Sequence, residues 1–385
     1  MLRKQTKRLI RRLSANDYRP LNRITLDRSA VLHNVAHLER QHPDAEIIPV
    51  LKGNAYGHGI AEVAEILNDT SCAFLAVDGY FEAGAIRDIT TKRILVMGYI
   101  LPENVHLLDI KRCSFVVQDT AGLRAFASLK RPVQIHMELN TGMNRLGLQS
   151  GEIAAYLAEL QRHPNLHLEG VMTHLADADN ELDESFSTRQ LEAFDEQVAA
   201  VYAAGFRPQL IHIAQTAGSA KVRSCYANAI RLGIGAYGIN PLLPKDSHYT
   251  ELAALQPVLE LRSTIIKCIE LQEGDKVSYN CTFVAPKAMR IGVLPLGFYE
   301  GVPRPLSNQG CATHNGTVLP IVGRVCMNHT MIDLDKTTLG VGDEVVLIAK
   351  QPLEPNSIRT LGATHGLFVY NMLTNLSSSI RREIV

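Results

Sequence analysis

The chain has 385 residues, of which 46% are hydrophobic and 20% are charged, as expected of a globular protein that buries a sizeable core. Lys plus Arg and Asp plus Glu both total 39, so the formal net charge is zero and no global field favours nucleic acid, a membrane or a highly charged substrate. No apolar run reaches the roughly 18 residues of a transmembrane helix. The function must therefore come from a local site.

The cysteines and the N-terminus bear on the cellular compartment. Seven cysteines are scattered without a C-x-x-C pair, which favours reduced thiols in a cytoplasmic protein. Residues 1–21 form a basic extension that lacks the apolar stretch of a secretory signal. We interpret this extension as a solvated arm, and the alternative is a short amphipathic helix that contacts acidic lipid or RNA.

Short apolar runs alternate with amphipathic segments from residue 23 to about 240, the pattern of repeated strand–helix units. The eight runs are EIIPVL (46–51), AFLAV (73–77), RILVM (93–97), SFVVQ (114–118), VQIHMEL (133–139), LHLEGVMTH (166–174), LIHIA (210–214) and AIRLGI (229–234). Helical periodicity falls between them at 29–38, 60–67, 123–129, 153–160 and 191–202. Eight parallel strands with intervening helices predict a closed (β/α)₈ barrel, and an open doubly wound sheet is the alternative.

The pattern changes after Leu242-Leu243-Pro244. Strand pairs joined by turns are predicted there, with Gly274-Asp275 and Gly342-Asp343 at the bends. We therefore expect a barrel domain over 22–245 and a mainly β domain over 250–385, joined by a linker near 241–250.

Lys52 directly follows the first strand run and precedes the glycine-rich segment GNAYGHG (53–59). The reactive groups of a (β/α)₈ barrel lie at the carboxyl ends of its strands. A lysine there, with a free pKa of about 10.4, is costly to bury as a cation unless it is paired or forms a Schiff base. An isolated strand-end lysine is more often salt-bridged at the surface, but this context favours a reactive amine.

The last two strand runs carry a second signal. Arg231 precedes LGIGAYG (232–238), and the seventh run leads into Gln215-Thr216-Ala217-Gly218-Ser219. The loops after strands seven and eight are the usual phosphate site of this fold, and glycines let backbone N–H groups approach a ligand. These residues predict a phosphorylated cofactor, although the glycines alone are also consistent with a turn built for packing.

The run KGNAYGHG (52–59) resembles the signature around the cofactor lysine of alanine racemases, a family of fold-type III pyridoxal-phosphate enzymes. The resemblance extends from about residue 22 to the C-terminus through NTGMNRLG (140–147), EGVMTHLADAD (169–179), RLGIGAYGINP (231–241), KVSYN (276–280), LPLGFYEG (294–301), VGRVCMNH (322–329) and VYN (369–371). It implies a barrel followed by a β domain in a head-to-tail homodimer. It also implies pyridoxal 5'-phosphate as the cofactor and interconversion of L- and D-alanine, which supplies D-alanine for peptidoglycan.

By similarity, two groups act as acid and base on opposite faces of the substrate. Lys52 works on one face, and Tyr279 of the VSYN motif, from the partner subunit, works on the other. His174 resembles the histidine that bridges this tyrosine to Arg231, although a lone strand histidine is also consistent with a core residue. Arg231 is implied to face the pyridine nitrogen, and because a guanidinium stays protonated, it leaves the ring a weaker electron sink.

The resemblance also implies the groups that bind the cofactor and the substrate. The phosphate ligands would be the hydroxyls of Tyr56, Thr216 and Tyr370 and the backbone N–H groups of Gly233 and Ile234, next to Gln215. Arg145 is implied near the phenolic oxygen of the cofactor and the substrate carboxylate, and the Met327 N–H near that carboxylate. Each of these side chains, taken alone, is also consistent with a packing or surface role.

The chain departs from the family pattern around the predicted pocket. Glu138 stands where many members carry a carbamylated lysine, so we hypothesise that it orients Arg145; the alternative is a polar residue that lines the barrel. Asn140, Phe298, Asn328 and Gln215 replace an aspartate, a gate tyrosine, an aspartate and an asparagine. Because a pocket gate sets which side chains enter, a serine or broad-specificity racemase is the alternative to alanine.

Two further functions share the cofactor. A fold-type III decarboxylase should show a His-x-Gly-Ser segment and a Gly-Gly-Gly loop, and this sequence has neither. A non-catalytic pyridoxal-phosphate carrier consists of the barrel alone, whereas this chain continues through 250–385. Metal catalysis has little support, since the 14 histidines include no HExxH motif.

Overall fold

The computed structural model describes residues 19–385, which form two compact units. One unit is Asp27–Val258, and the other joins residues 19–26 to Leu259–Val385. The interpretation of the basic extension as a solvated arm concerns residues 1–18 almost entirely, and these lie outside the described residues.

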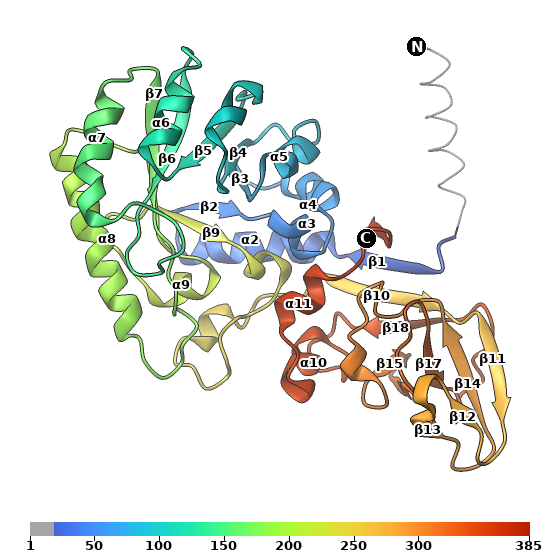
Figure 1. The fold of residues 1–385 in the computed structure, drawn as a ribbon. Coiled ribbons are helices and arrows are strands. Elements are labelled where there is room, and N and C mark those ends of the chain that lie inside the picture. The colour runs from blue at the N-terminus through green and yellow to red at the C-terminus, as the bar shows by residue number, and fades with distance from the viewer. Residues whose placement is uncertain (1–18) are drawn as a thin grey trace, which may run out of the picture. The chain divides into compact units, whose positions relative to one another are not determined.

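The unit Asp27–Val258 is a barrel of parallel strands, coloured blue to yellow in Figure 1. Its strands pair in the order β2-β9-β8-β7-β6-β5-β4-β3, and a bridge between Val50 and Ala76 closes the sheet. The strands are β2 (Glu46–Pro49), β3 (Phe74–Val77), β4 (Arg93–Val96), β5 (Cys113–Val117), β6 (Val133–Glu138), β7 (Leu166–Met172), β8 (Leu210–His212) and β9 (Ala229–Leu232). Each strand overlaps one predicted run. The prediction of a (β/α)₈ barrel is therefore confirmed, and the alternative of an open doubly wound sheet is wrong.

Helices connect the barrel strands, and all five predicted helices are present. The α-helices are α2 (Arg28–Gln41), α3 (Lys52–Tyr56), α4 (Ile60–Leu67), α5 (Tyr80–Ile86), α6 (Thr120–Ala127), α7 (Ile153–Gln161), α8 (Ser185–Ala203) and α9 (Thr216–Lys221). Short 3₁₀ turns are η1 (Pro102–Leu107), η2 (Ser150–Glu152), η3 (Ile234–Tyr237) and η4 (Tyr249–Leu252). The side chains of Asp27 and Asp119 cap α2 and α6 by accepting from backbone N–H groups of their first turns, which fixes where these helices begin.

The second unit is mainly β, as predicted, and is coloured yellow to red in Figure 1 apart from its first strand. Three sheets have the orders β16-β15-β18-β10-β1-β19, β11-β14-β17 and β12-β13. The strands are β1 (Asn22–Leu26), β10 (Leu259–Thr264), β11 (Lys267–Leu271), β12 (Lys276–Val277), β13 (Phe283–Val284), β14 (Met289–Leu294), β15 (Cys311–His314), β16 (Thr317–Pro320), β17 (Thr330–Asp333), β18 (Glu344–Ile348) and β19 (Arg381–Ile384). The helices are η5 (Tyr279–Cys281), η6 (Arg304–Leu306), α10 (Ile358–His365) and α11 (Val369–Thr374).

The unit boundaries differ from the predicted domain boundaries. Strand β1 pairs antiparallel with β10 and parallel with β19, so residues 22–26 belong to the C-terminal unit rather than to the barrel. At the other end, the barrel unit extends to Val258, whose carbonyl accepts from the N–H of Asp27. The alternation that buries Ile24 and Leu26 predicts a strand but not which sheet the strand joins.

The predicted strand pairs of the C-terminal unit are partly wrong. Gly274 and Gly342 form turns where expected, with φ of 91° and 97°. The strands around them pair elsewhere, because β11 pairs with β14, β12 with β13, and β18 with β10 and β15. A glycine turn reverses the chain without choosing the partner of the next strand.

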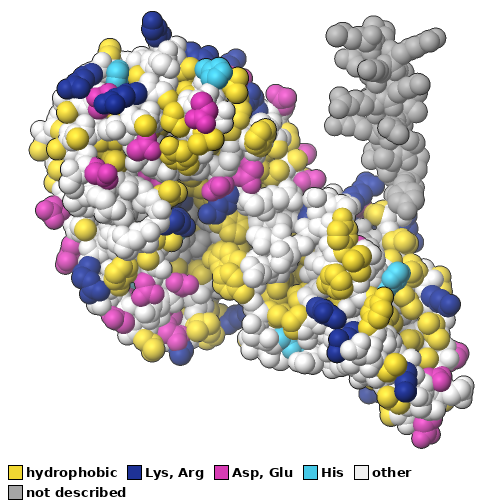
Figure 2. All heavy atoms as spheres, in the orientation of Figure 1, with side chains coloured by type: hydrophobic (Ala, Val, Ile, Leu, Met, Phe, Trp, Pro, Cys, Tyr) yellow, Lys and Arg dark blue, Asp and Glu magenta, His cyan; other side chains and the backbone are white. Residues whose placement is uncertain are grey.

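The surface carries charges of both signs. Figure 2 shows Lys and Arg side chains interspersed with Asp and Glu over the visible face of the barrel unit, in keeping with the zero net charge. Within residues 19–385, no helix is both long enough and apolar enough to cross a membrane. All seven cysteines are free thiols.

Gly238 packs against the last residues of the barrel unit, at a position where only glycine fits. Its φ is 81°, and an added Cβ would lie 1.8 Å from the carbonyl oxygen of Gln256. We expect Gly238→Ala to lower the free energy of unfolding by more than about 3 kcal/mol, measured by urea titration. The control Gly205→Ala has a similar φ, 89°, with nothing within 4 Å, and should cost only about 1 kcal/mol. Equal losses would contradict a steric restriction at Gly238.

Candidate active site

A cavity of about 240 Å³ lies at the carboxyl ends of the barrel strands. Its lining side chains come from positions at or just beyond the ends of β2, β3, β4, β6, β7, β8 and β9. The sequence-predicted residues that line it are Lys52, Tyr56, Arg145, His174, Gln215, Arg231 and Gly233. The barrel therefore brings seven of the predicted site residues together.

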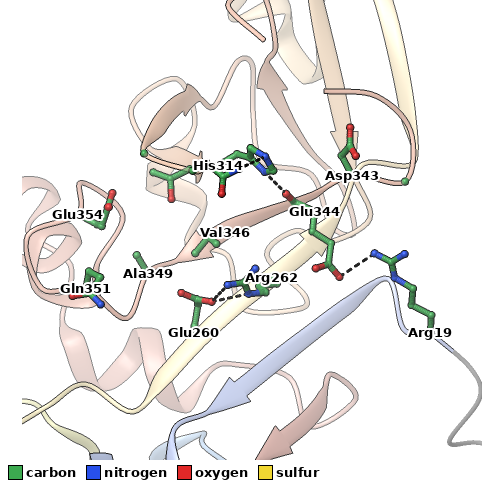
Figure 3. A pocket seen from close by; sticks show the side chains of 14 residues that line it. Arg19, Glu260, Arg262, His314, Asp343, Glu344, Val346, Ala349, Gln351 and Glu354 are labelled. Atoms are coloured by element: carbon green, nitrogen blue, oxygen red, sulfur yellow. Dashed lines mark hydrogen bonds and ion pairs between the residues drawn. The ribbon is translucent and has the colours of Figure 1, made fainter. Parts of the chain in front are cut away.

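A larger cavity, of about 510 Å³, lies in the C-terminal unit, and Figure 3 shows two of its arginines, Arg262 and Arg19, each pointing toward a glutamate. Glu260 accepts from Arg262 Nε at 2.6 Å, and Arg19 lies 3.4 Å from Glu344. His314 Nδ1 lies 2.7 Å from the backbone oxygen of Glu344. Because these charges satisfy one another, the barrel cavity is the better candidate for an active site.

Lys52 begins a turn of unusual handedness. Residues 53–57 all have φ between 51° and 82°, which makes α3 largely a left-handed turn. Residues other than glycine cost about 1–2 kcal/mol each in this conformation. The turn is held by Asn54 Oδ1, which accepts from the Ile60 N–H at 2.9 Å, and by Glu82, which accepts from the Gly53 N–H at 2.7 Å. The glycines of this segment indicate a left-handed conformation at their own positions. Among the other residues only Asn54 is of a type that often adopts a positive φ, so the sequence does not predict the left-handed conformation of its neighbours.

The electrostatic surroundings of Lys52 favour a neutral amine. Burial lowers its pKa most; Asp78 raises it, and Arg145 and Arg231 lower it further. Among the described residues, no carboxylate forms an ion pair with Lys52. A lowered pKa increases the fraction of neutral amine at a given pH, and the neutral amine is the nucleophile.

The loops after β8 and β9 meet beside Tyr56. A Cβ added to Gly233 would lie 2.8 Å from the Tyr56 hydroxyl, so a glycine is needed for the hydroxyl to approach this closely. The buried Thr216 accepts from the Gly235 N–H at 3.1 Å, which ties the two loops together, and Ile234 is buried next to Gly233. The Gln215 side-chain oxygen is buried without a hydrogen-bond partner in the described chain.

Arg231 occupies the base of the cavity and is 3% exposed. Its Nη2 donates to the carbonyl of Thr173 at 2.6 Å and to that of Ile213 at 3.1 Å, and its Nη1 donates to the carbonyl of His212 at 2.8 Å. Burial lowers its pKa to about 10, so the guanidinium still carries its proton at neutral pH. It forms no ion pair with any carboxylate of residues 19–385.

His174 must be neutral in this setting. Burial and the positive charges of Arg231, Arg145 and Lys52 lower its pKa to about 3. Its Nδ1 lies 3.2 Å from Nη2 of Arg231, which can only donate. The proton of the imidazole therefore sits on Nε2, which is left as a donor.

Glu138 also lines the cavity, but it does not contact Arg145 directly. It is 5% exposed and accepts from Gln118 Nε2 at 2.8 Å. Burial raises its pKa, whereas Arg231, Gln118 and Arg145 each lower it. Within the described part of the chain no ion pair joins Glu138 to Arg145, so its influence on that arginine acts through space.

Tyr279, Met327 and Tyr370 belong to the C-terminal unit. Tyr279 opens η5 and is 67% exposed, and Met327 is 56% exposed. The neighbouring Ser278 has φ of 67° and donates to the carbonyl of Arg324 at 2.7 Å, which ties the tyrosine turn to the loop that carries Met327. Tyr370, in α11, stacks on Phe368 with ring centroids 5.1 Å apart.

Replacing His174 by Asn should weaken the acid sensitivity of folding. Its pKa is lowered on folding, so the stability that it contributes is fully present above about pH 6.5 and is lost as the pH falls toward 3. Between pH 7 and pH 5 the wild-type chain should lose about 2 kcal/mol more free energy of unfolding than His174→Asn, measured by urea titration. Equal losses in the two proteins would show that His174 binds a proton as readily folded as unfolded.

Fold and site together define a class of enzyme: a (β/α)₈ barrel with a desolvated lysine at the carboxyl end of its first strand, followed by a β unit. The chain matches the model of the alanine racemase N-terminal domain over residues 26–241 and that of the C-terminal domain over 258–384. It therefore belongs to the alanine racemase family.

Known alanine racemases are similar to this chain in sequence and in structure over nearly the full length. The alanine racemase of Carboxydothermus hydrogenoformans is 34% identical over 363 residues, which cover 92% of this chain and 97% of the relative. The crystal structure of alanine racemase from Bacillus anthracis with bound L-Ala-P is similar with a TM-score of 0.85 and 29% identity, covering 96% of both chains. The alanine racemase of Bartonella henselae with covalently bound pyridoxal phosphate shares the fold, with a TM-score of 0.82, 22% identity and coverage of 95% and 100%.

Proposed function

We propose that the protein is a pyridoxal-5'-phosphate-dependent isomerase that interconverts L-alanine and D-alanine. The observation that carries the proposal is the pairing, in one cavity, of a lysine with a lowered pKa and a buried arginine that can only donate. Membership of the alanine racemase family supplies the reaction class and the first substrate to test.

The residues around the cavity fit the cofactor. The Tyr56 hydroxyl approaches Gly233 closely, next to Thr216, and these hydroxyls with the N–H groups of Gly233 and Ile234 would bind the phosphate. Tyr370, of the C-terminal unit, is a further proposed ligand of the phosphate. Gln215 offers a buried oxygen without a partner, and Arg231 would face the ring nitrogen. Bound there, pyridoxal phosphate supplies an aldehyde carbon for the Lys52 amine and an electron sink that acidifies the Cα–H bond of an amino acid.

Racemisation removes a proton from one face of Cα and returns one to the other face. The Lys52 amine, whose pKa is lowered by burial, serves one face, and the Tyr279 hydroxyl serves the other. A free tyrosine has a pKa of about 10, so its phenolate needs a donor to form near neutral pH. His174 can be that donor, because Arg231 occupies Nδ1 and leaves the proton on Nε2. The guanidinium of Arg145 and the N–H of Met327 would bind the substrate carboxylate.

We further propose a cytoplasmic homodimer in which Tyr279 enters the active site of the partner subunit. Apolar side chains are exposed on the C-terminal unit beside this tyrosine: Phe298 and Tyr299 are 44% and 62% exposed, and Phe298 is bonded by its backbone to Cys326, next to Met327. Such exposed groups are typical of surfaces that bind a partner. The free thiols suit a reducing compartment, where D-alanine would be made for peptidoglycan.

The first test is covalent attachment and turnover. The full-length chain incubated with pyridoxal phosphate and then reduced with borohydride should carry the cofactor on Lys52, and it should racemise L-alanine faster than L-serine, L-lysine or L-arginine. Lys52→Ala should abolish both the attachment and the activity, because it removes the only amine proposed to react. A colourless protein with no reduced adduct at residue 52 would contradict the proposal, and a preference for serine would correct the substrate.

The second test asks whether the site is shared. Lys52→Ala and Tyr279→Phe should each be inactive alone, since each removes one of the two bases. Co-expressed in equal amounts, they should recover roughly a quarter of the wild-type activity, because half of the random dimers are mixed and each mixed dimer has one intact site. Different affinity tags on the two variants, purified one after the other, isolate the mixed dimer and confirm that mixing occurs. No recovery from mixed dimers would place both bases in one subunit.

A further inference from the structure

Six consecutive barrel strands each contribute one polar side chain to a network beneath the cavity, which is buried except at Arg93, whose side chain is 34% exposed. These are Arg93 on β4, Ser114 on β5, His136 on β6, Glu169 on β7, His212 on β8 and Arg231 on β9. Both histidines are fully buried, and Glu169 is 6% exposed. Because the interior of such a barrel is ordinarily filled by branched apolar side chains, a polar chain through it calls for an explanation.

The network is continuous from one end of the barrel to the cavity. Glu169 accepts from Arg93, and its Oε2 accepts from the Ser114 hydroxyl at 2.5 Å. The same oxygen lies 3.2 Å from His136 Nε2, and His136 Nδ1 lies 2.9 Å from His212 Nε2. His212 Nδ1 lies 2.7 Å from Nη1 of Arg231, which lines the cavity.

The backbone is shaped to admit this network. The register between β6 and β7 shifts so that Ile135 pairs with Leu168 while His136 pairs with Gly170, which makes Glu169 the extra residue of a β-bulge. A bulge re-aims the side chain that it carries. A Cβ on Gly170 would lie 2.2 Å from Nδ1 of His136, so a glycine is needed to make room for the imidazole.

The two ends of the network fix the direction of every hydrogen bond in it. Arg231 can only donate, so His212 must accept at Nδ1 and carry its proton on Nε2. His136 must then accept at Nδ1 and donate from Nε2, and an ionised Glu169 can only accept. Both imidazoles are thus neutral and fully satisfied, which agrees with their lowered pKa values.

We propose that Glu169 is a positioning residue for Arg231, which it holds at the base of the cavity by fixing the tautomers of His136 and His212. The structural part of this proposal, the tautomers, stands on the barrel alone. Its kinetic consequence rests on the proposed racemase function. The alternative is that the network only satisfies buried polar groups, in which case the direction of its hydrogen bonds does not matter to the site.

The variant Glu169→Gln distinguishes these two explanations. An ionised carboxylate accepts hydrogen bonds at both oxygens, whereas an amide accepts at its oxygen and donates from its NH₂ group. Arg93 can only donate, so the amide oxygen has to face it, and the amide NH₂ then faces His136. The NH₂ group forces His136 to accept at Nε2, which reverses both tautomers and turns the His212 Nδ1–H toward Arg231. Two donors then oppose each other at 2.7 Å, and Arg231 must shift.

The experiment measures imidazole tautomers and kinetics in the full-length protein labelled with ¹⁵N-histidine. Coupling across the N–H···N bond identifies His136 and His212, and wild type should carry both protons on Nε2. In Glu169→Gln both should move to Nδ1, and kcat for L-alanine should fall about tenfold, the loss of one charge-assisted hydrogen bond. The control Glu159→Gln also loses a carboxylate bound to arginine and histidine, Arg124 and His163, and should change neither tautomers nor kcat.

The outcomes separate the two layers of the proposal. Unchanged tautomers in Glu169→Gln, or a proton on Nδ1 of either ring in wild type, overturn it; the wild-type spectrum still decides if the variant does not fold. Reversed tautomers with an unchanged kcat overturn the positioning role. A wild-type protein that carries Nε2 protons but racemises nothing refutes the proposed function and leaves the network direction intact.

Discussion

The burial of the Arg231 guanidinium, with no ion pair to a carboxylate of residues 19–385, is the constraint on which the site depends. A lone charge in the interior costs several kcal/mol unless its hydrogen bonds are satisfied. Here the carbonyls of Thr173, His212 and Ile213, at the ends of β7 and β8, accept from it. Strands β7, β8 and β9 are neighbours in the barrel sheet, so the strand order places these carbonyls around the side chain of Arg231.

The charge of Arg231 adds to the effect of burial on its neighbours. Burial lowers the pKa of both Lys52 and His174, and Arg231 and Arg145 lower it further, which raises the neutral fraction of the amine and keeps the imidazole neutral. Glu138 also lines the cavity, where burial raises its pKa and Arg231 lowers it. The guanidinium groups of Arg145 and Arg231 in the same lining suit a phosphorylated cofactor and an amino-acid carboxylate.

Local sequence patterns predicted the parts of the structure that depend on burial alone. The eight apolar runs of the barrel and Lys52 at the end of the first run follow from periodicity and from where barrels carry reactive groups. Strand β1 was assigned to the wrong domain because Ile24 and Leu26 would be buried in either sheet. The left-handed turn after Lys52 escaped prediction because Ala55 and Tyr56 do not favour that conformation; contacts made elsewhere in the barrel stabilise it.

The network beneath the cavity was missed for a different reason. His136 and Glu169 lie inside runs that were interpreted as apolar strands, and nothing in either run shows that the two side chains meet. The available signal was Glu169-Gly170, since a glycine inside a strand often marks a bulge or a close approach. Two buried polar side chains on adjacent strands cost stability unless each donor faces an acceptor. Here only one arrangement of the imidazole protons satisfies every hydrogen bond. A barrel selected for stability alone would fill this layer with branched apolar side chains, so the polar layer is better explained by the arginine above it.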